Sequence, residues 1–376
     1  MKTKKKPLGK PDKILLLVTI LLIIIGIFSI ISASSRETVV RYELSMYHFF
    51  NRHMLILVAA SIISIFILAM PTFTYKSLSV LLFAGILVVY AALYVYGSIK
   101  RGNVAWFEGG GQPSEFAKPI IIVALSVFFS IYYNKIKKKI PYNFYVFHIL
   151  FLLIGFLIPI ATLLMGDTGT ALLTSGIVIT MYIMCPIPRF EKIKGMTIFA
   201  SLTIVCFTFL FAFKGDILSA EQKSRFNFYD PCSKYEDSGY QICNGLIAMN
   251  DGGLLGLGLG KSKQKYSYIP DPHTDSIFAI VVEETGLIIG LFILGLYYVM
   301  ITRILKIAYE TNIPRNKYIC IGIAAYVFMH ILFNLGGLLA IFPLTGVPLP
   351  LISYGGSFTV SFIAALAVVQ RIKMEI

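Results

Sequence analysis

A carboxylate and an ammonium group lie three residues apart, at Glu115 and Lys118, where an apolar stretch begins. Residues at this spacing share one face of a helix, and Pro113 followed by Ser114 can begin one. Two interpretations are open. The pair can be a self-satisfied ion pair that anchors the helix. Alternatively, Lys118 can bind an anionic group of a substrate while Glu115 holds the ammonium in place and keeps it charged.

A second carboxylate, Asp275, ends the run Pro270–Asp275 directly before another apolar stretch. Asp is a good N-cap residue, so one interpretation is structural. A carboxylate at the border of an apolar environment also holds a proton more readily than one in water, which suits a general base. A cap needs neither His273 nor the Gly-rich approach at 252–260, so we favour Asp275 as a base. The two roles are compatible.

The other ionisable residues in or beside apolar stretches have structural interpretations. Glu283 and Glu284 are adjacent and point about 100° apart on a helix, so we expect at most one to pair well with a cation inside the bundle. Asp167 is expected to cap a helix. His330 is expected to be hydrogen-bonded packing and not a ligand.

The five cysteines show no metal-binding pattern, because no two of them stand at a CxxC spacing. Cys185, Cys206 and Cys320 fall in or beside apolar stretches and are expected to be buried. Cys232 and Cys243 share one polar segment, where a disulfide can form but free thiols are favoured.

The elements that must position these residues are membrane helices. Of the 376 residues, 57% are hydrophobic and 14% charged, whereas soluble domains carry about 25% charged residues. A bilayer core requires about 20 apolar residues per helix. We therefore predict an all-α polytopic membrane protein with a single domain over 1–376 and about ten spans: 14–33, 54–70, 75–97, 114–133, 145–165, 170–185, 195–213, 276–301, 318–342 and 352–370.

The basic residues predict the orientation. They gather in alternate segments between the apolar stretches, including the tail 1–13 and the cluster at 135–139, which places both chain ends in the cytoplasm. The first apolar stretch is too long for a signal peptide, so we expect it to be retained. The net charge of +14 does not indicate nucleic acid, because the charges line no helix face. Segment 214–275 is expected to be a large outer loop.

Four motifs occur in an order that resembles the SEDS family (shape, elongation, division and sporulation proteins), and the likeness covers almost the whole chain. They are Gln112–Lys118, Gly166–Thr170, Pro270–Asp275 and Pro343–Ser357. Segment 260–270 is more similar to the FtsW and SpoVE branch than to RodA. The resemblance implies a peptidoglycan glycosyltransferase that polymerises lipid II at the outer face of the cytoplasmic membrane. It also implies a class B penicillin-binding protein as partner, together with other division or elongation proteins.

By the same resemblance, Asp275 matches the essential acidic residue of the family, and Glu115 and Lys118 match its cavity pair. Three positions depart from the family pattern: Ala105, where a basic residue is usual, Gly166 and Ser276. Arg101 can substitute for the missing cation at position 105.

The chemistry of transfer from a lipid pyrophosphate requires a base and cations for the leaving group. We expect Asp275 to be the base. A divalent cation, Mg or Mn, can share the work of the cations, although the sequence contains no clear metal ligands. The residues expected to bind substrate are Glu115, Lys118, Arg101, Lys263, Lys265 and His273, with Arg225 as a further loop cation.

Two other classes of function compete with the glycosyltransferase. A flippase for the same lipid-linked precursor would also need a polar cavity, but it predicts polar groups at mid-depth of the membrane. This sequence concentrates them near one end of the predicted spans. A scaffold that only recruits an enzyme would tolerate loss of every charged site residue.

Overall fold

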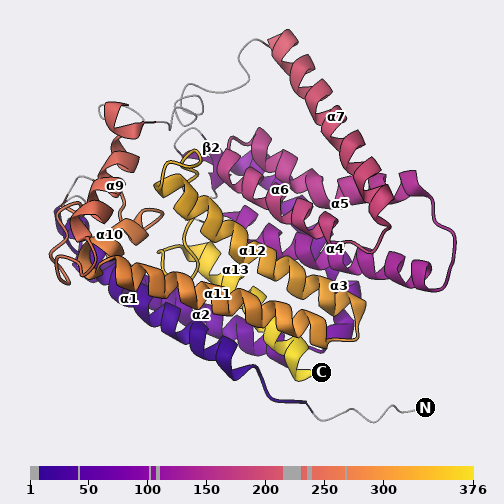
Figure 1. Cartoon of the computed structure of the whole chain (residues 1–376), viewed down its shortest axis with the longest axis horizontal. Helices are drawn as coiled ribbons and strands as arrows, with labels where there is room; N and C mark the ends of the chain where they lie inside the picture. Colours follow the sequence, from indigo (N-terminus) through magenta and orange to yellow (C-terminus); the bar gives the residue numbers. More distant parts are fainter. Residues whose placement is uncertain are drawn as a thin grey trace.

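The computed structural model describes residues 8–40, 43–100, 103–106, 111–214, 230–234, 239–266 and 269–376. It is a bundle of long helices (Figure 1). Eight helices in these ranges are long and apolar enough to cross a membrane. They are α1 (Lys13–Val40), α2 (His48–Ala69), α3 (Tyr75–Tyr96), α4 (Pro113–Lys137), α5 (Phe144–Leu164), α11 (Leu287–Glu310), α12 (Pro314–Leu338) and α13 (Gly356–Met374).

The structure contains further helices, turns and strands. They are α6 (Thr168–Ile183), α7 (Arg189–Lys214), α9 (Tyr240–Gly252), α10 (Ile277–Thr285), the turns η1 (Thr72–Thr74) and η2 (Pro231–Lys234), and the strands β1 (Ser98–Lys100) and β2 (Asn103–Trp106). The two strands pair antiparallel as a small hairpin. The prediction of an all-α polytopic membrane fold is confirmed apart from this hairpin, while the number of spans stays a prediction.

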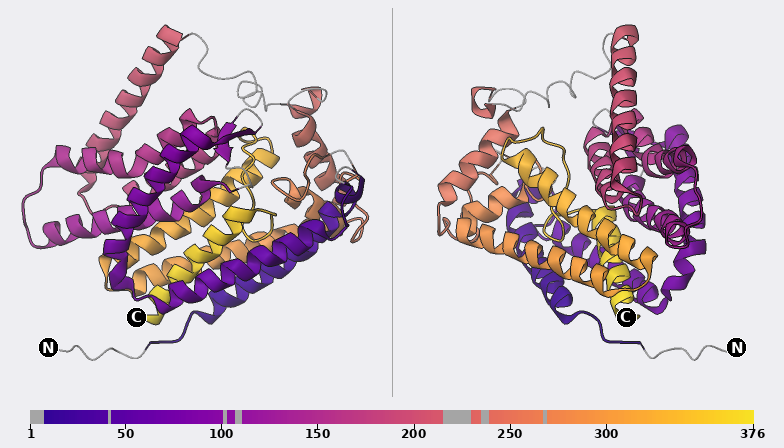
Figure 2. Two further views of the ribbon diagram at one scale, coloured as in Figure 1. Left: turned by 180° about the vertical axis from the view of Figure 1, so that it is seen from behind. Right: turned by 45° about the vertical axis from the view of Figure 1, so that its right-hand side comes forward.

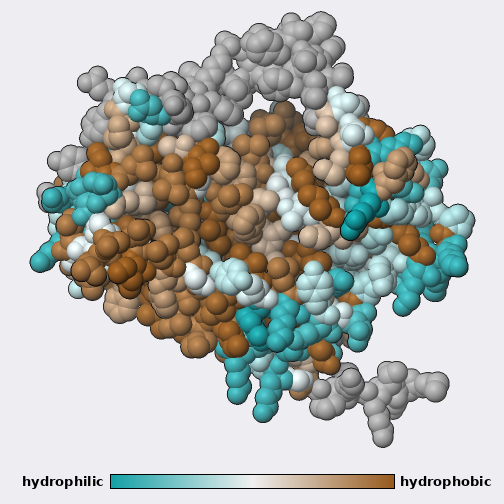
Figure 3. Space-filling model, viewed as in Figure 1, coloured by the Kyte–Doolittle hydropathy of each residue, from teal (hydrophilic) through white to brown (hydrophobic). Residues whose placement is uncertain are grey.

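Two helices form the centre of the bundle. In the most apolar part of each helix, about 67% of the α12 residues and 61% of the α13 residues are buried, whereas only 11% of the α2 residues are buried. Figure 1 shows α12 and α13 lying among the other helices. Outer helices instead present leucine, isoleucine and phenylalanine side chains to the surroundings, and Figure 3 shows a broad apolar face. An apolar exterior around a more polar centre is what a lipid environment favours.

One predicted span is broken. Stretch 276–301 is two helices, α10 and α11, separated at Gly286 with φ of 86°. Only glycine fits here, because a Cβ would lie 2.2 Å from the carbonyl oxygen of Leu254. The Gly-rich turn holds the break, since Leu287 N donates to Gly253 O at 2.9 Å. Prediction of one continuous helix was therefore wrong.

The two ends of the described chain lie side by side at one end of the bundle (Figure 2). Gly9 N donates to Met374 O at 2.8 Å, and Arg303 contacts Asp12 at 2.5 Å. Burial disfavours the charge of Asp12, but hydrogen bonds from Arg303 and the Leu15 amide outweigh it and hold the pKa of the carboxyl below its usual value. Both ends therefore share one side, and which side of the membrane it is stays a prediction.

Segment 214–275 contains a disulfide, so our preference for free thiols was wrong. Cys232 in η2 and Cys243 in the first turns of α9 are bonded, with their Cα atoms 5.0 Å apart. Helix α9 directs Cys243 inward, where it is 2% exposed, against η2. The sequence separation of 11 residues could not show this approach. Cys185 and Cys320 are buried free thiols, as predicted.

Candidate functional site

Asp275 lies at the start of α10, where α9 packs against it. Its Oδ1 accepts hydrogen bonds from Gln241 Nε2 at 3.3 Å and from Thr274 Oγ1 at 3.1 Å. Gln241 also donates to Ser276 Oγ at 2.9 Å. The N-cap of α10 is Ser276, without a side-chain capping bond, so Asp275 is not the cap. The carboxylate is instead oriented by side chains from α9 and from its own loop.

The main chain at Asp275 is anchored to α12. Asn334 is 3% exposed, and its Nδ2 donates to the carbonyl of Asp275 at 2.7 Å and to that of Val347 at 2.8 Å. One amide group therefore joins α10 to loop 339–355. A buried carbonyl without a hydrogen-bond donor is costly. Asn334 supplies a donor to both carbonyls and so holds the main chain at Asp275 against Val347.

Lys118 and Glu115 form a closed ion pair on α4. The ammonium of Lys118 lies 2.8 Å from both carboxylate oxygens, and the two residues are 1% and 3% exposed. Lys118 Nζ also lies 3.3 Å from His330 Nε2. His330 Nδ1 lies 3.2 Å from Pro348 O, which fits a ring that donates to Pro348 and accepts from Lys118. The prediction that His330 is hydrogen-bonded is confirmed.

His330 and Asn334 are four residues apart and lie on the same face of α12. One turn of helix, about 5 to 6 Å, therefore separates the group that contacts Lys118 from the group that holds Asp275. The Pro343–Pro350 segment contacts both. The structure brings the predicted ion pair and the predicted base to one end of the bundle, in neighbouring layers that are linked through α12 and the Pro343–Pro350 segment.

Other helix starts converge on the same end. Gln112 Nε2 donates to Asp167 Oδ2 at 2.9 Å, and Asp167 caps α6 by accepting from Thr170 N at 3.1 Å. The prediction for Asp167 is thus confirmed. Helix α6 approaches the 343–350 segment so closely that a Cβ on Gly169 would lie 2.4 Å from Thr345 O. Three of the motifs found in the sequence are therefore in contact.

His273 is buried in an aromatic cluster. Its ring centroid is 4.2 Å from that of Phe49 and 5.5 Å from that of Tyr354, and its carbonyl accepts from Tyr354 N at 2.9 Å. Burial raises the pKa of the Tyr354 hydroxyl, although Arg52 acts in the opposite direction. His273 therefore joins α2 to loop 339–355 beside Asp275, and Arg52 is a cation at this end that the sequence analysis did not select.

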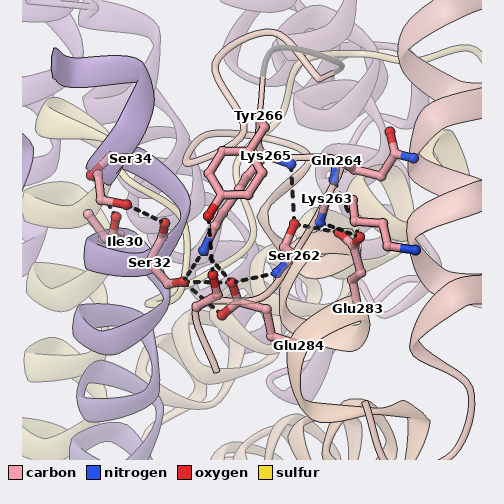
Figure 4. A network of polar contacts seen from close by, with 12 residues as sticks. Ile30, Ser32, Ser34, Ser262, Lys263, Gln264, Lys265, Tyr266, Glu283 and Glu284 are labelled. Carbon is pink, nitrogen blue, oxygen red and sulfur yellow. Dashed lines mark hydrogen bonds and ion pairs between the residues drawn. The ribbon is translucent and has the colours of Figure 1, made fainter. Parts of the chain in front are cut away.

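Figure 4 shows where Lys265 and the two adjacent glutamates lie. Lys265 Nζ is 2.7 Å from Glu284 Oε1 and 3.1 Å from Ser32 Oγ of α1. Glu283 accepts from Ser262 Oγ and from Lys263 N. Both glutamates are therefore buried, but only Glu284 pairs with a cation, as predicted, while Glu283 is held by hydroxyl and backbone amide donors. They fasten segment 261–266 to the end of α10.

The predicted substrate-binding residues therefore differ in accessibility. The Lys263 side chain is exposed, whereas Lys118 and Lys265 are buried against carboxylates. Arg101 and Arg225 lie outside the described residues. Within the described ranges, no three His, Cys, Asp or Glu side chains come together as a metal cage.

Comparison with known proteins identifies the family of the chain. The family described as "Cell cycle protein", FtsW/RodA/SpoVE, matches residues 12–376. The chain belongs to this family. It is 32% identical to "Probable peptidoglycan glycosyltransferase FtsW" of Bacillus subtilis (strain 168), over 98% of this chain and 92% of that protein. It is 31% identical to "Stage V sporulation protein E" of the same organism, over 99% of both.

The fold of the family is also known from solved structures. One is a chain from "Structural coordination of polymerization and crosslinking by a peptidoglycan synthase complex", with TM-score 0.74, 21% identity, and coverage of 96% of this chain and 97% of that one. Another is Thermus thermophilus rod shape determining protein RodA, with TM-score 0.67, 21% identity and coverage of 96% of each chain. The resemblance seen in the four motifs is therefore confirmed at the level of family and fold.

Proposed function

We propose that this chain is a peptidoglycan glycosyltransferase, which polymerises lipid II into glycan strands at the outer face of the cell membrane. Relatives over almost its full length bear the name peptidoglycan glycosyltransferase FtsW. The observation that carries the proposal is Asp275, a carboxylate oriented by Gln241 and anchored through its main chain by Asn334. Catalytic groups must be held in place by such supporting contacts.

The reaction defines the roles. When a sugar hydroxyl attacks the anomeric carbon of the donor, its proton must leave and negative charge grows on the pyrophosphate. Asp275 takes that proton as general base. Cations stabilise the leaving pyrophosphate, and Lys263 is the exposed candidate. Arg101 completes the proposed set from outside the described residues.

Lys118 and Lys265 are proposed to bind substrate only if each is released from its present partner. The Lys118 ammonium is held by Glu115, and the Lys265 ammonium is held by Glu284. Each can bind substrate phosphate only by exchanging that partner for phosphate oxygens. His273 packs between two aromatic rings, so its proposed part is to shape the loop beside Asp275.

We propose a divalent cation only as an ion that the substrate phosphates help to bind. Mg²⁺ in proteins is usually held by one or two carboxylates together with substrate phosphates. Asp275 and the pyrophosphate offer such oxygens, whereas the described part of the chain provides no complete cage. Removal of divalent ions with a chelator tests whether polymerisation needs the cation.

A class B penicillin-binding protein is the proposed partner. A solved chain with this fold belongs to a peptidoglycan synthase complex that coordinates polymerization and crosslinking. A polymerase supplies glycan strands, and a transpeptidase crosslinks them. Co-purification of the two proteins from membranes tests the partnership.

Reconstitution with labelled lipid II tests the function directly. Purified chain in vesicles is expected to produce glycan polymers that a muramidase digests. If labelled lipid crosses the bilayer and no polymer forms, the chain is a flippase. If there is no polymer and no lipid movement, the chain is a scaffold. Either of these two results would contradict the proposal.

A further inference from the structure

A cavity lies between α5, α6 and α7, far along the chain from Asp275. It has a volume of about 310 Å³ and an almost entirely apolar lining that includes Phe151, Phe156, Ile179, Met196 and Phe199. Its volume falls at the lower end of the range for small-molecule sites, about 300 to 1,000 Å³. Helix α7 diverges from α5 and α6 along its length (Figures 1 and 2), and its residues between Gly195 and Ala200 line the cavity.

Two polar side chains in the wall of this cavity, His148 and Tyr182, are already satisfied. His148 Nε2 lies 2.7 Å from Tyr182 OH, and His148 Nδ1 lies 2.8 Å from Phe144 O. Helix α7 closes tightly on this pair, because a Cβ on Gly195 would lie 2.2 Å from both His148 Nε2 and Tyr182 OH. What remains open to a ligand is hydrocarbon, which suits an acyl chain and not a polar molecule.

The rim of the cavity is basic. Lys194 Nζ lies 5.2 Å above the ring of Phe144, which itself lines the cavity. The first turns of α7 contain three basic residues, Arg189, Lys192 and Lys194, and one acid, so their balance is 3 − 1 = +2. That acid, Glu191, accepts a hydrogen bond from Tyr142, so it is partly engaged. An anionic group is therefore favoured where the cavity meets the helix ends.

We propose that this cavity binds one acyl chain of an anionic phospholipid, with the headgroup phosphate held by Lys194. The apolar wall selects a hydrocarbon chain, and the basic rim selects a negative headgroup over a zwitterionic one. A single basic residue at a membrane surface favours an anionic lipid by about 1 kcal/mol, or about fivefold. The site is separate from Asp275, so it stands or falls independently of the proposed reaction.

Fluorescence quenching by brominated lipids tests this site. The only tryptophan of the chain is Trp106, so a Trp106→Phe background carrying Phe199→Trp reports on the cavity alone. The protein is placed in phosphatidylcholine vesicles with a minor fraction of phosphatidylglycerol, and either lipid is brominated on its acyl chain. Brominated phosphatidylglycerol is expected to quench about fivefold more than its mole fraction predicts.

Two controls separate the cavity from bulk lipid. Phe66→Trp, on the same background, places the probe at a residue of α2 that is 69% exposed, and its quenching is expected to follow mole fraction alone. Lys194→Gln added to Phe199→Trp is expected to remove the preference while leaving quenching by bulk lipid. Equal quenching by the two lipids at position 199, or a preference that survives Lys194→Gln, would overturn the proposal.

Discussion

Replacing Lys265 with methionine is expected to destabilise the protein strongly, even though the residue was selected from sequence as a substrate ligand. The side chains of Lys265 and Glu284 are 3% and 4% exposed, and their charged atoms are 2.7 Å apart. Removing one partner leaves a buried carboxylate unpaired, which costs about 3 to 5 kcal/mol. The free energy of unfolding, measured by denaturation in detergent micelles, should fall by that amount.

A second substitution should recover most of the loss. In Lys265→Met/Glu284→Gln no charge is left unpaired, and the glutamine oxygen can still accept from Ser32 and from the Ser262 amide. Lys263→Met is the matched control, because it removes the same charged group from an exposed position two residues away. It should change the free energy of unfolding by no more than about 0.5 kcal/mol. A Lys265→Met protein as stable as wild type would refute the assignment of Lys265 to a structural pair.

Three further predictions concern the elements around the site. Gly286→Ala is expected to cost about 1 to 3 kcal/mol of stability because φ is 86° and a Cβ would meet Leu254 O, whereas Gly295→Ala on open α11 should be neutral or stabilising; equal unfolding midpoints would contradict this. Reducing the disulfide should cost about 3 kcal/mol and speed amide hydrogen exchange in α9, and unchanged exchange would count against it. Asp12→Asn should lower stability at neutral pH. Because the folded pKa of Asp12 is depressed, the gap to wild type should close only as pH falls through that pKa; a gap that closes near pH 6 would be inconsistent.

Much of the fold could be read from hydropathy, because lipid requires long apolar helices whatever their packing. The break at Gly286 could not, since both α10 and α11 are apolar and the break depends on the close approach of the 252–256 turn. Gly286, directly after Glu283, Glu284 and Thr285, was the available signal in the sequence.

The residues of the site were predicted unevenly for a similar reason. Glu115 and Lys118 are three apart on one helix, so sequence alone placed them together. Helix geometry also predicted that at most one of Glu283 and Glu284 pairs with a cation. It could not show that segment 261–266 supplies Lys265 to Glu284 and the Ser262 hydroxyl to Glu283. Asn334 is a single amide in an apolar helix, and only the packing of α12 shows that it holds the carbonyl of Asp275.

The most direct test is the yield of glycan polymer from lipid II with Asp275→Asn. This substitution keeps an oxygen for Gln241 and Thr274 but removes the base, so polymer is expected to fall about 10²- to 10⁴-fold. Asp251→Asn makes the same chemical change on α9 and should give close to the wild-type yield. A near-normal yield from Asp275→Asn would contradict the assignment of Asp275 as the base.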